Sequence, residues 1–228
     1  MSTLILDRAS CSPQGYRKQP LTELDAAFES GLLYVVVGKQ GSGKKAMLAL
    51  LSGIAVAAAG AVYYNGEDLK NLDRDKYRSQ NVGVVSRGCN LLPGATAIDN
   101  VLLSMCVKSG LCTSLKSLSP SSRKKACKLL ERVGIPKEKI RKRADTLSAE
   151  EIKRVDLACA LAHEPNVLLV NDPQNSQDSN DTQSMMDILL MLAHEEKKCV
   201  IVTTSSRIVA DFADELWGLN GGRLTFIR

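Results

Sequence analysis

The sequence predicts an α/β protein whose mostly parallel sheet is interrupted by an all-helical insert. Short apolar runs, typical of buried strands, alternate with segments of helical periodicity in the first and last parts of the chain. Between about residues 89 and 145 these runs give way to helical periodicity with many Lys, Arg and Ser. We therefore expect a single domain over residues 1–228, with a core formed by 1–88 and 146–228 and a helical subdomain at 89–145.

Turn and cap residues set the expected ends of the individual elements. Asn65-Gly66 predicts a tight turn after a strand, and Ser119-Pro120 predicts a helix start, with Ser as N-cap and Pro at the first helical position. The expected strands cover residues 31–38, 60–66, 82–85, 167–170 and 200–203. The expected helices cover residues 46–59, 119–133, 150–162 and 181–194, followed by a short helix through 210 and 215 and a turn at 221–222.

Composition indicates a globular protein with an ordinary apolar content of 44%. The seven cysteines are odd in number, scattered along the chain and form no Cys-x-x-Cys pair. This pattern argues against a disulfide framework and against a zinc site, so we expect reduced thiols in a cytoplasmic protein.

Membrane and nucleic-acid roles are not favoured. The chain lacks the basic start and apolar core of a signal peptide, and its most apolar stretch, 46–62, is too short to span a bilayer. We therefore expect no direct membrane insertion. The net charge of +5 is mild, and the basic runs at 123–125 and 137–143 carry no interleaved aromatic residues, so we expect no binding to nucleic acid.

A glycine-rich loop follows the expected strand at 31–38. It has the G-x-x-x-x-G-K pattern of a P-loop, whose inward-facing backbone N–H groups cradle phosphates, and it consists of Gly38, Lys39, Gln40, Gly41, Ser42, Gly43 and Lys44. Lys44 is expected to reach the terminal phosphates of ATP or ADP. Lys45 and Ala46 follow, where a P-loop carries the hydroxyl that ligates Mg²⁺. Because an ammonium group repels a metal ion and cannot ligate it, we expect this chain not to hold Mg²⁺.

Downstream segments in their order and spacing resemble those of the ATP-binding-cassette (ABC) ATPases over essentially the whole chain. The small cassettes of lipoprotein-release and macrolide-export systems are most similar. The resemblance is carried by residues 90–93 and 96–101 after the family's Q-loop, 130–134 at the end of its helical subdomain, 147–151 at its signature, 166–173 at its Walker B strand, 200–204 at its H-loop strand and 220–224 at its terminal hairpin. It implies a P-loop (RecA-like) α/β core with an antiparallel β element near the N-terminus and an inserted helical subdomain.

The same resemblance marks departures at the positions that act in hydrolysis. Arg87 stands where the family has the Q-loop glutamine, and Asn171 stands where it has the Walker B aspartate that supports the metal. Asp172 takes the place of the catalytic glutamate, one methylene shorter, and Thr204 that of the switch histidine. Asp178 matches the family's D-loop aspartate. Together these changes predict the loss of metal supports and a weakened general base, so we expect Asp172 not to be a competent catalytic residue.

The signature segment departs from the family's LSGGQ as well. Ser148, Ala149, Glu150 and Glu151 form the pattern of a capping box, in which Ser148 and Glu151 satisfy each other's backbone N–H groups. In a working cassette this helix end faces the γ-phosphate bound by the opposite subunit. Here a methyl group and two carboxylates crowd that approach, so we expect this surface to reject a phosphate.

The function favoured by the resemblance is that of a degenerate nucleotide-binding subunit of an ABC transporter. Such a subunit would sit peripherally on the inner face of the membrane through a permease partner and pair with an intact ABC ATPase subunit as a heterodimer. One alternative is a slow transport ATPase that uses water-bridged Mg²⁺ and Asp172. Another is a soluble nucleotide sensor or scaffold without a permease. Tyr16 is either an aromatic that stacks on adenine or an exposed loop residue.

Overall fold

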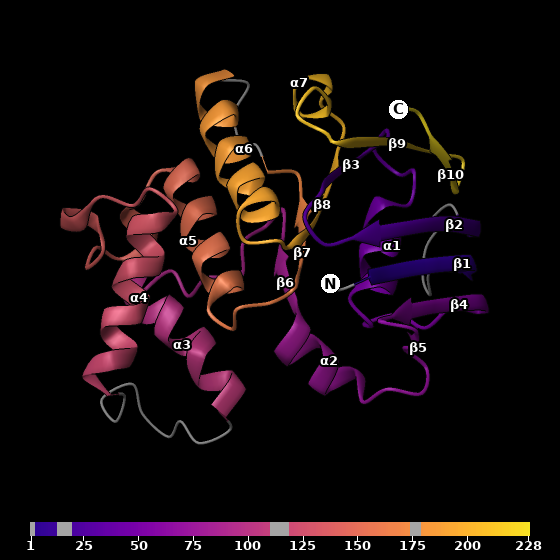
Figure 1. Cartoon of the computed structure of the whole chain (residues 1–228). Helices are drawn as coiled ribbons and strands as arrows, with labels where there is room; N and C mark the ends of the chain where they lie inside the picture. The colour runs from indigo at the N-terminus through magenta and orange to yellow at the C-terminus, as the bar shows by residue number, and fades with distance from the viewer. Residues whose placement is uncertain (1–2, 13–19, 110–118, 174–178) are drawn as a thin grey trace.

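The computed structural model describes residues 3–12, 20–109, 119–173 and 179–228. These residues form two sheets with helices packed between and beside them (Figure 1). In the described ranges, no helix is both long and apolar enough to cross a membrane. Tyr16 and Asp178 lie outside the described residues.

The smaller sheet is antiparallel, with the strand order β2-β1-β4-β5. Its strands are β1 (Thr3–Cys11), β2 (Leu21–Glu29), β4 (Ala59–Tyr64) and β5 (Glu67–Asp68). Asn65 and Gly66 have φ values of 51° and 84° and join β4 to β5 as the predicted tight turn. The expected antiparallel element near the N-terminus is confirmed.

The larger sheet has the order β10-β9-β3-β8-β7-β6. Its strands are β3 (Leu33–Val37), β6 (Val82–Val85), β7 (Val167–Asn171), β8 (Cys199–Thr204), β9 (Glu215–Asn220) and β10 (Arg223–Phe226). The neighbours from β9 to β6 pair in parallel, as predicted, whereas β10 pairs antiparallel with β9 in the expected terminal hairpin. The carboxyl ends of β3, β7 and β8 therefore meet at one edge of the sheet.

Two hydrophobic cores lie on opposite faces of the larger sheet. On β3, Leu33 and Val35 join one core, whereas Tyr34 and Val36 join the other. Because both faces are buried, the strand is a continuous apolar run with no polar alternation. The second core also includes side chains of α1 and of the smaller sheet, so α1 is packed between the two sheets (Figure 1).

The helices divide between the two cores. They are α1 (Lys44–Leu51), α2 (Arg74–Asn81), α3 (Ala97–Ser109), α4 (Pro120–Arg132), α5 (Ala149–Leu161), α6 (Ser179–His194) and α7 (Arg207–Ala210), with short 3₁₀ helices at Lys137–Lys139 and Ala144–Thr146. Helices α3 and α4 pack against α5 on the side of the molecule away from the smaller sheet (Figure 1). The predicted cap is confirmed, because the Ser119 hydroxyl accepts the N–H of Ser122 and Pro120 begins α4.

Two expected helices are corrected by the structure. The helix expected at 46–59 begins at residue 44 and ends at 51, because Gly53 turns the chain at φ 70° and the N–H of Ala58 bonds to the Ser10 carbonyl in the smaller sheet. The short helix at the C-terminal end does not reach residue 215, because Glu215 pairs with Tyr34 in the β3–β9 ladder. In both places pairing with a distant strand overrides the local apolar pattern.

The expectation of reduced thiols holds in part. Within the described ranges it is confirmed for five cysteines that are free, Cys11, Cys89, Cys127, Cys159 and Cys199, whereas Cys112 lies outside those ranges. It is wrong for Cys106, which is disulfide-bonded. Sequence spacing did not indicate this bond, because the approach of two cysteines in space decides whether they can pair.

The close approach of β4 to β1 leads to a stability prediction. Gly60 has φ 70°, and a Cβ atom there would overlap the backbone carbonyl of Arg8. We expect Gly60→Ala to lower the free energy of unfolding by about 2–4 kcal/mol, the sum of backbone strain and steric overlap. Gly66→Ala is the matched control, because Gly66 has φ 84° but nothing within 4 Å of its added Cβ, and it should cost only about 1 kcal/mol. Denaturant unfolding measures both, and equal losses would contradict the prediction.

Candidate nucleotide-binding site

The P-loop, residues 38–44, connects the carboxyl end of β3 to α1 as the sequence predicts. Gly41 and Gly43 have φ values of 87° and 107°, which side chains other than glycine rarely adopt. A Cβ atom on Gly38 would lie 2.6 Å from the backbone oxygen of Leu219 and would overlap the Ser42 hydroxyl. These three glycines therefore permit the tight backbone path of the loop.

Lys44 is the first residue of α1 and is directed back into the P-loop. Its ammonium donates to the carbonyl of Gly38 and, at 3.1 Å, to that of Lys39. Burial lowers the pKa of Lys44, the charge of Asp172 opposes that shift, and the charge of Arg87 adds to it. A buried ammonium therefore lies within the curve of the loop, where P-loops bind phosphates.

Ser42 gives a direct sign that the P-loop suits an anion. Its hydroxyl oxygen is buried and has no hydrogen-bond partner among the described residues. Buried polar atoms normally have a partner, and a phosphate oxygen would supply one to a donor in this loop. The P-loop therefore fits a phosphate group. Lys39, Gln40 and Gly41 are exposed in the same loop.

The ends of β7 and β8 carry the other predicted site residues beside the P-loop. The Gly38 N–H donates to the Thr204 carbonyl at 3.0 Å, which ties the start of the loop to the end of β8. Thr204 is fully buried, and its hydroxyl accepts the N–H of Ser206. Asn171 is also buried, and its amide oxygen accepts the hydroxyl of Thr203 at 3.2 Å. Both polar groups are therefore engaged within the sheet edge.

Arg87 and Asp172 form an ion pair beside the P-loop that the sequence did not reveal. The Arg87 Nε lies 3.7 Å from the Asp172 carboxylate. Asp172 has φ 52°, and its N–H bonds to the Thr203 carbonyl at 2.8 Å, so the turn after β7 fixes its backbone. The Asp172 carboxylate thus has a cationic neighbour from the loop that follows β6.

The loop that carries Arg87 is held by two charged residues of α5. Lys153 and Asp156 are almost wholly buried, and both bond to the backbone of residues 86–90. Sequence analysis missed them. The sequence carries these opposite charges three positions apart on α5, between the apolar residues Ile152 and Leu157, and buried charges need partners.

The capping box at the start of α5 is confirmed. The Ser148 hydroxyl accepts the Glu151 N–H at 3.2 Å, and the Glu151 carboxylate accepts the Ser148 N–H at 3.0 Å. The carboxylates are also paired within the chain, Glu151 with Lys139 and Glu150 with Arg154. Their charges are therefore largely compensated, which the sequence pattern alone did not indicate.

Lys45 and Ala46 lie in the first turn of α1, where Lys45 is exposed and Ala46 is half-buried. The described residues contain no group of three or more His, Cys, Asp or Glu side chains placed to hold a metal ion.

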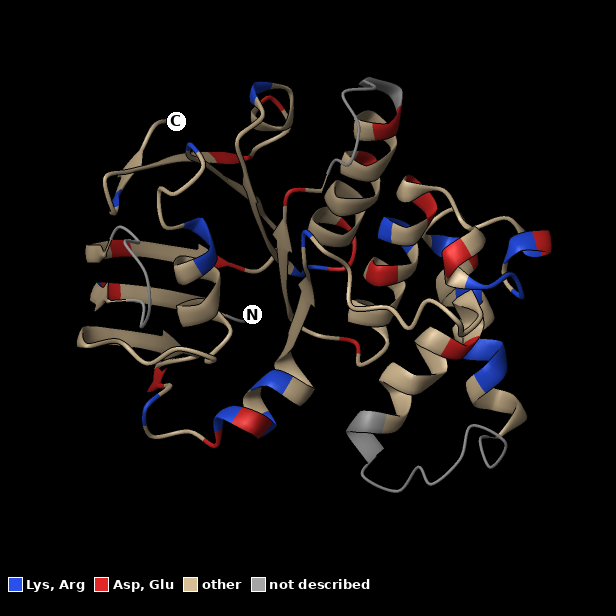
Figure 2. Ribbon diagram, turned by 180° about the vertical axis from the view of Figure 1, so that it is seen from behind, with Lys and Arg blue, Asp and Glu red and all other residues tan. Residues whose placement is uncertain are grey.

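The structure brings most of the expected site residues to one sheet edge, namely the P-loop, Arg87, Asn171, Asp172 and the carbonyl of Thr204. The positions of charged residues along the ribbon are spread over both the strand-rich and the helix-rich parts of the molecule (Figure 2).

Comparison with known proteins identifies the family. The family model described as ABC transporter matches residues 21–175. The chain belongs to the ABC transporter family. This cassette is 33% identical over 215 residues to an uncharacterized ABC transporter ATP-binding protein of Mycobacterium tuberculosis, a match that covers 91% of this chain and 82% of that protein. It is therefore an ABC ATPase subunit of a transporter.

Further matches include two sequence relatives that are named for different cargoes and one solved structure. The cassette is 31% identical to the lipoprotein-releasing system ATP-binding protein LolD of Pseudomonas fluorescens, over 91% of this chain and 89% of that one. It is 28% identical to the phosphonates import ATP-binding protein PhnC 2 of Oceanobacillus iheyensis, over 90% and 82%. The dimeric structure of MJ0796, a bacterial ABC transporter cassette, superposes with a TM-score of 0.86 at 26% identity and covers 99% of both chains. The predicted P-loop core with its antiparallel element and inserted helices is confirmed.

Glu151 leads to a pH-dependent stability prediction. Burial raises the pKa of Glu151, but hydrogen bonds from Lys139 and Ser148 outweigh burial and lower it overall. A carboxyl whose folded pKa is lowered adds stability above its unfolded pKa, about 4.3, and loses it as the pH falls through the folded value. We therefore expect Glu151→Gln to cost about 1 kcal/mol at pH 7 and progressively less below about pH 4.

Unfolding free energies from pH 7 down to pH 3 test this expectation. Glutamine keeps the capping hydrogen bonds, so the substitution isolates the charge. Glu138→Gln is the control, because Glu138 is exposed and should change stability little at any pH. A loss for Glu151→Gln that stays constant over this range would contradict the prediction.

Proposed function

We propose that this cassette is a catalytically impaired nucleotide-binding subunit, which binds ATP or ADP without Mg²⁺ and contributes structure or regulation to its transporter. The observation that carries the proposal is the set of charges around the P-loop. Lys44, Lys45 and Arg87 place three cations near the phosphate and metal positions, and Asp172, their carboxylate neighbour, already pairs with Arg87. This set favours a bare polyphosphate over a metal complex.

The donors near the P-loop do not fit Mg²⁺. This ion requires octahedral oxygen ligands, usually one or two carboxylates with waters and phosphates. Lys45 replaces the hydroxyl that a P-loop supplies. Asn171 offers a neutral oxygen that already accepts the Thr203 hydroxyl. No step of the proposed function therefore passes through a bound metal ion.

Activation of water is weakened as well. Asp172 is one methylene shorter than glutamate, and its carboxylate already lies 3.7 Å from the Arg87 Nε, a contact that competes with a water molecule for the same oxygens. The hydroxyl of Thr204 accepts a local backbone N–H at the end of β8, and a threonine hydroxyl does not titrate near neutral pH as histidine does. These features support an impaired site over the alternative of a slow transport ATPase.

The start of α5 supports pairing with a different, intact cassette. MJ0796 is a dimer in its structures, one of them with ADP and Pi bound. In this chain the capping box occupies the N–H groups of Ser148 and Glu151, so fewer donors remain for a phosphate of an opposite subunit. Ala149 and Glu150 also add side chains where the family has glycines. A heterodimer places this chain's P-loop against a normal signature, whereas a homodimer does not.

The lack of turnover is the first test of the proposal. We expect the purified cassette to release phosphate from ATP no faster than its Lys44→Ala variant, with or without Mg²⁺. Loss of one group that stabilises a transition state commonly costs on the order of 10²–10³ in rate, and several are replaced here. Turnover that requires Mg²⁺ and disappears in Lys44→Ala would refute the impaired site and favour the slow ATPase.

Metal independence is the second test. We expect ATP to bind equally well in EDTA and in millimolar Mg²⁺, since the Lys45 ammonium takes the place of the ion through a charge-assisted hydrogen bond to a phosphate oxygen. Lys45→Thr removes that charge and should weaken binding in EDTA by about tenfold, with part of the loss recovered on adding Mg²⁺. Calorimetric titration measures each case. Tight binding by the parent chain that vanishes on chelation would show a working metal site.

The partners are tested by capture from the cell. We expect the cassette to stay monomeric with ATP in light scattering. We also expect it to co-purify from detergent-solubilised membranes with a membrane permease and a complete second cassette. The physical reason is the asymmetry of its two contact elements, an intact P-loop and a capped signature helix. Recovery of neither partner would favour a soluble nucleotide sensor or scaffold.

A further inference from the structure

The loop of residues 86–90 connects β6 to the segment before α3 and is bonded to α5 by charged side chains at both of its ends. The Lys153 ammonium donates to the Ser86 carbonyl at 2.7 Å and to the Arg87 carbonyl at 3.3 Å. The Asp156 carboxylate accepts the N–H of Ser86 at 3.3 Å and that of Asn90 at 3.4 Å. The two carboxylate oxygens of Asp156 thus bind one end of the loop each, and Lys153 binds the carbonyls at its start.

These two side chains are buried to a degree that is unusual for charged residues. Lys153 is 1% exposed and Asp156 is 4% exposed, and such groups are rarely this buried unless they are paired. Burial lowers the pKa of Lys153 and raises that of Asp156, and the attraction between the two opposes both shifts. Hydrogen bonds between charged groups and backbone are stronger than neutral ones, and a buried unpaired charge is costly. The loop is therefore strongly held in one conformation.

Arg87 depends on this support because its own contact is weak. Its side chain is 64% exposed, and its closest approach to Asp172 is 3.7 Å. Exposed ion pairs of this kind contribute at most about 1 kcal/mol and fix no geometry by themselves. Arg87 also lies in a loop where Cys89 has φ 46°. The backbone, held by Lys153 and Asp156, therefore decides where the guanidinium lies.

We propose that Lys153 and Asp156 are positioning residues, which clamp the 86–90 loop to α5 and so keep Arg87 on Asp172 at the edge of the P-loop. The clamp gives the site a fixed internal cation and keeps the carboxylate at the catalytic position paired. It also joins the loop rigidly to the helix that begins with the signature segment. The expected effect of the clamp on ATP affinity rests on the proposed metal-free binding. The existence of the clamp does not depend on that proposal.

The clamp and a general electrostatic effect predict different changes in ATP affinity. Lys153→Met removes a cation and Asp156→Asn removes an anion, so long-range attraction for phosphate should fall in the first variant and rise in the second. Under the proposal both variants release Arg87 and both weaken binding. Lys128→Met is the matched control, since Lys128 is an exposed lysine of α4.

The experiment combines amide hydrogen exchange with calorimetric titration of ATP in EDTA. We expect Lys153→Met and Asp156→Asn to speed exchange at residues 86–90 by about tenfold or more, with exchange in β3 and β8 unchanged. We expect both to weaken ATP binding by about three- to tenfold and to add nothing further in an Arg87→Gln background. Lys128→Met should match the parent in both measurements.

Two results would overturn the proposal. One is exchange at residues 86–90 that stays at the parent rate in both variants. The other is a change in ATP affinity of opposite sign in the two variants, which would indicate long-range charge alone. If the parent chain binds no ATP, the proposed function fails, while the exchange measurement still decides whether the clamp exists.

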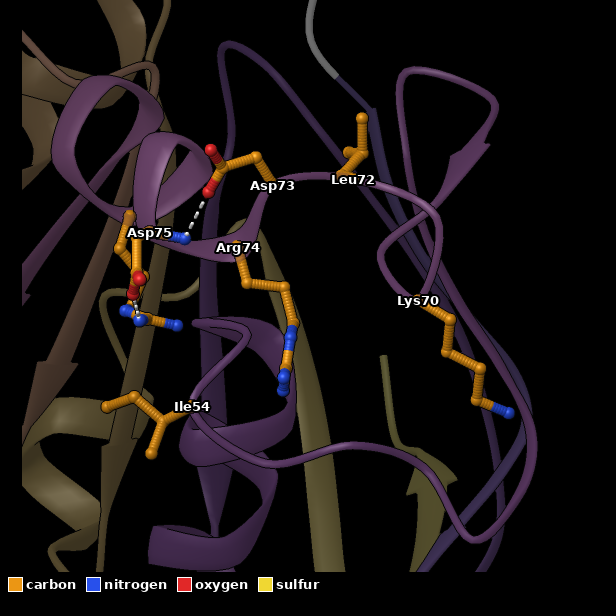
Figure 3. Close-up of a pocket in the computed structure, with 7 residues that line it drawn as sticks. Ile54, Lys70, Leu72, Asp73, Arg74 and Asp75 are labelled. Atoms are coloured by element: carbon orange, nitrogen blue, oxygen red, sulfur yellow. Dashed lines mark hydrogen bonds and ion pairs between the residues drawn. The ribbon is translucent and has the colours of Figure 1, made fainter.

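A pocket elsewhere on the surface carries no comparable inference. It has a volume of about 480 Å³ and lies between the end of α1 and the start of α2, where Arg74 extends between Ile54 on one side and Lys70 on the other (Figure 3). Asp73 caps α2 by accepting the N–H groups of Asp75 and Lys76. The acidic side chains here are thus engaged in local structure.

Discussion

The parallel pairing of β3 with β8, and of β8 with β7, is the constraint on which the site depends. It aligns Val37 with Thr204 and Asn171 with Thr203, so the chain leaves all three strands at one edge of the sheet. The hydrogen bond from Gly38 to Thr204 then fixes where the P-loop begins. With both sheet faces buried in apolar cores, this register cannot slip by one residue without turning core side chains to the wrong face. The phosphate cradle is thus a consequence of strand pairing.

Several charged groups lie along that edge of the sheet. A transporter cassette that binds Mg²⁺-ATP needs acidic and hydroxyl oxygens beside its P-loop. This chain presents ammonium and guanidinium groups there, and its carboxylate is paired. These side chains lie at strand ends, in loops and in the first turn of α1, outside the two hydrophobic cores. The apolar residues that stabilise the molecule and the polar residues of the candidate site are therefore separate sets.

The neighbourhood of Arg87 links the site to the helical part of the molecule. Charged groups on α5 bind the backbone of the 86–90 loop, and the same helix begins with a capping box that satisfies its first N–H groups. Helix α5 is therefore a single rigid element that contacts the 86–90 loop beside the P-loop and also carries residues 148–151 at its start. Its charges are paired within the chain at both places, so each contact strengthens local structure.

The sequence alone determined the P-loop and the order of the strands and helices, because these depend on residue type and spacing. It also gave the capping box, a local pattern. The expected departures from the family at Lys45, Arg87, Asn171 and Thr204 come from the sequence too, and they stay predictions. The end of α1, the strand at Glu215 and the pairing of Arg87 with Asp172 were decided only by tertiary structure. So were the ion pairs of Glu150 and Glu151 and the buried positions of Lys153 and Asp156. The physical reason is shared: these features arise from contacts between residues distant in sequence or from partners on another element, and local propensity carries no information about such partners.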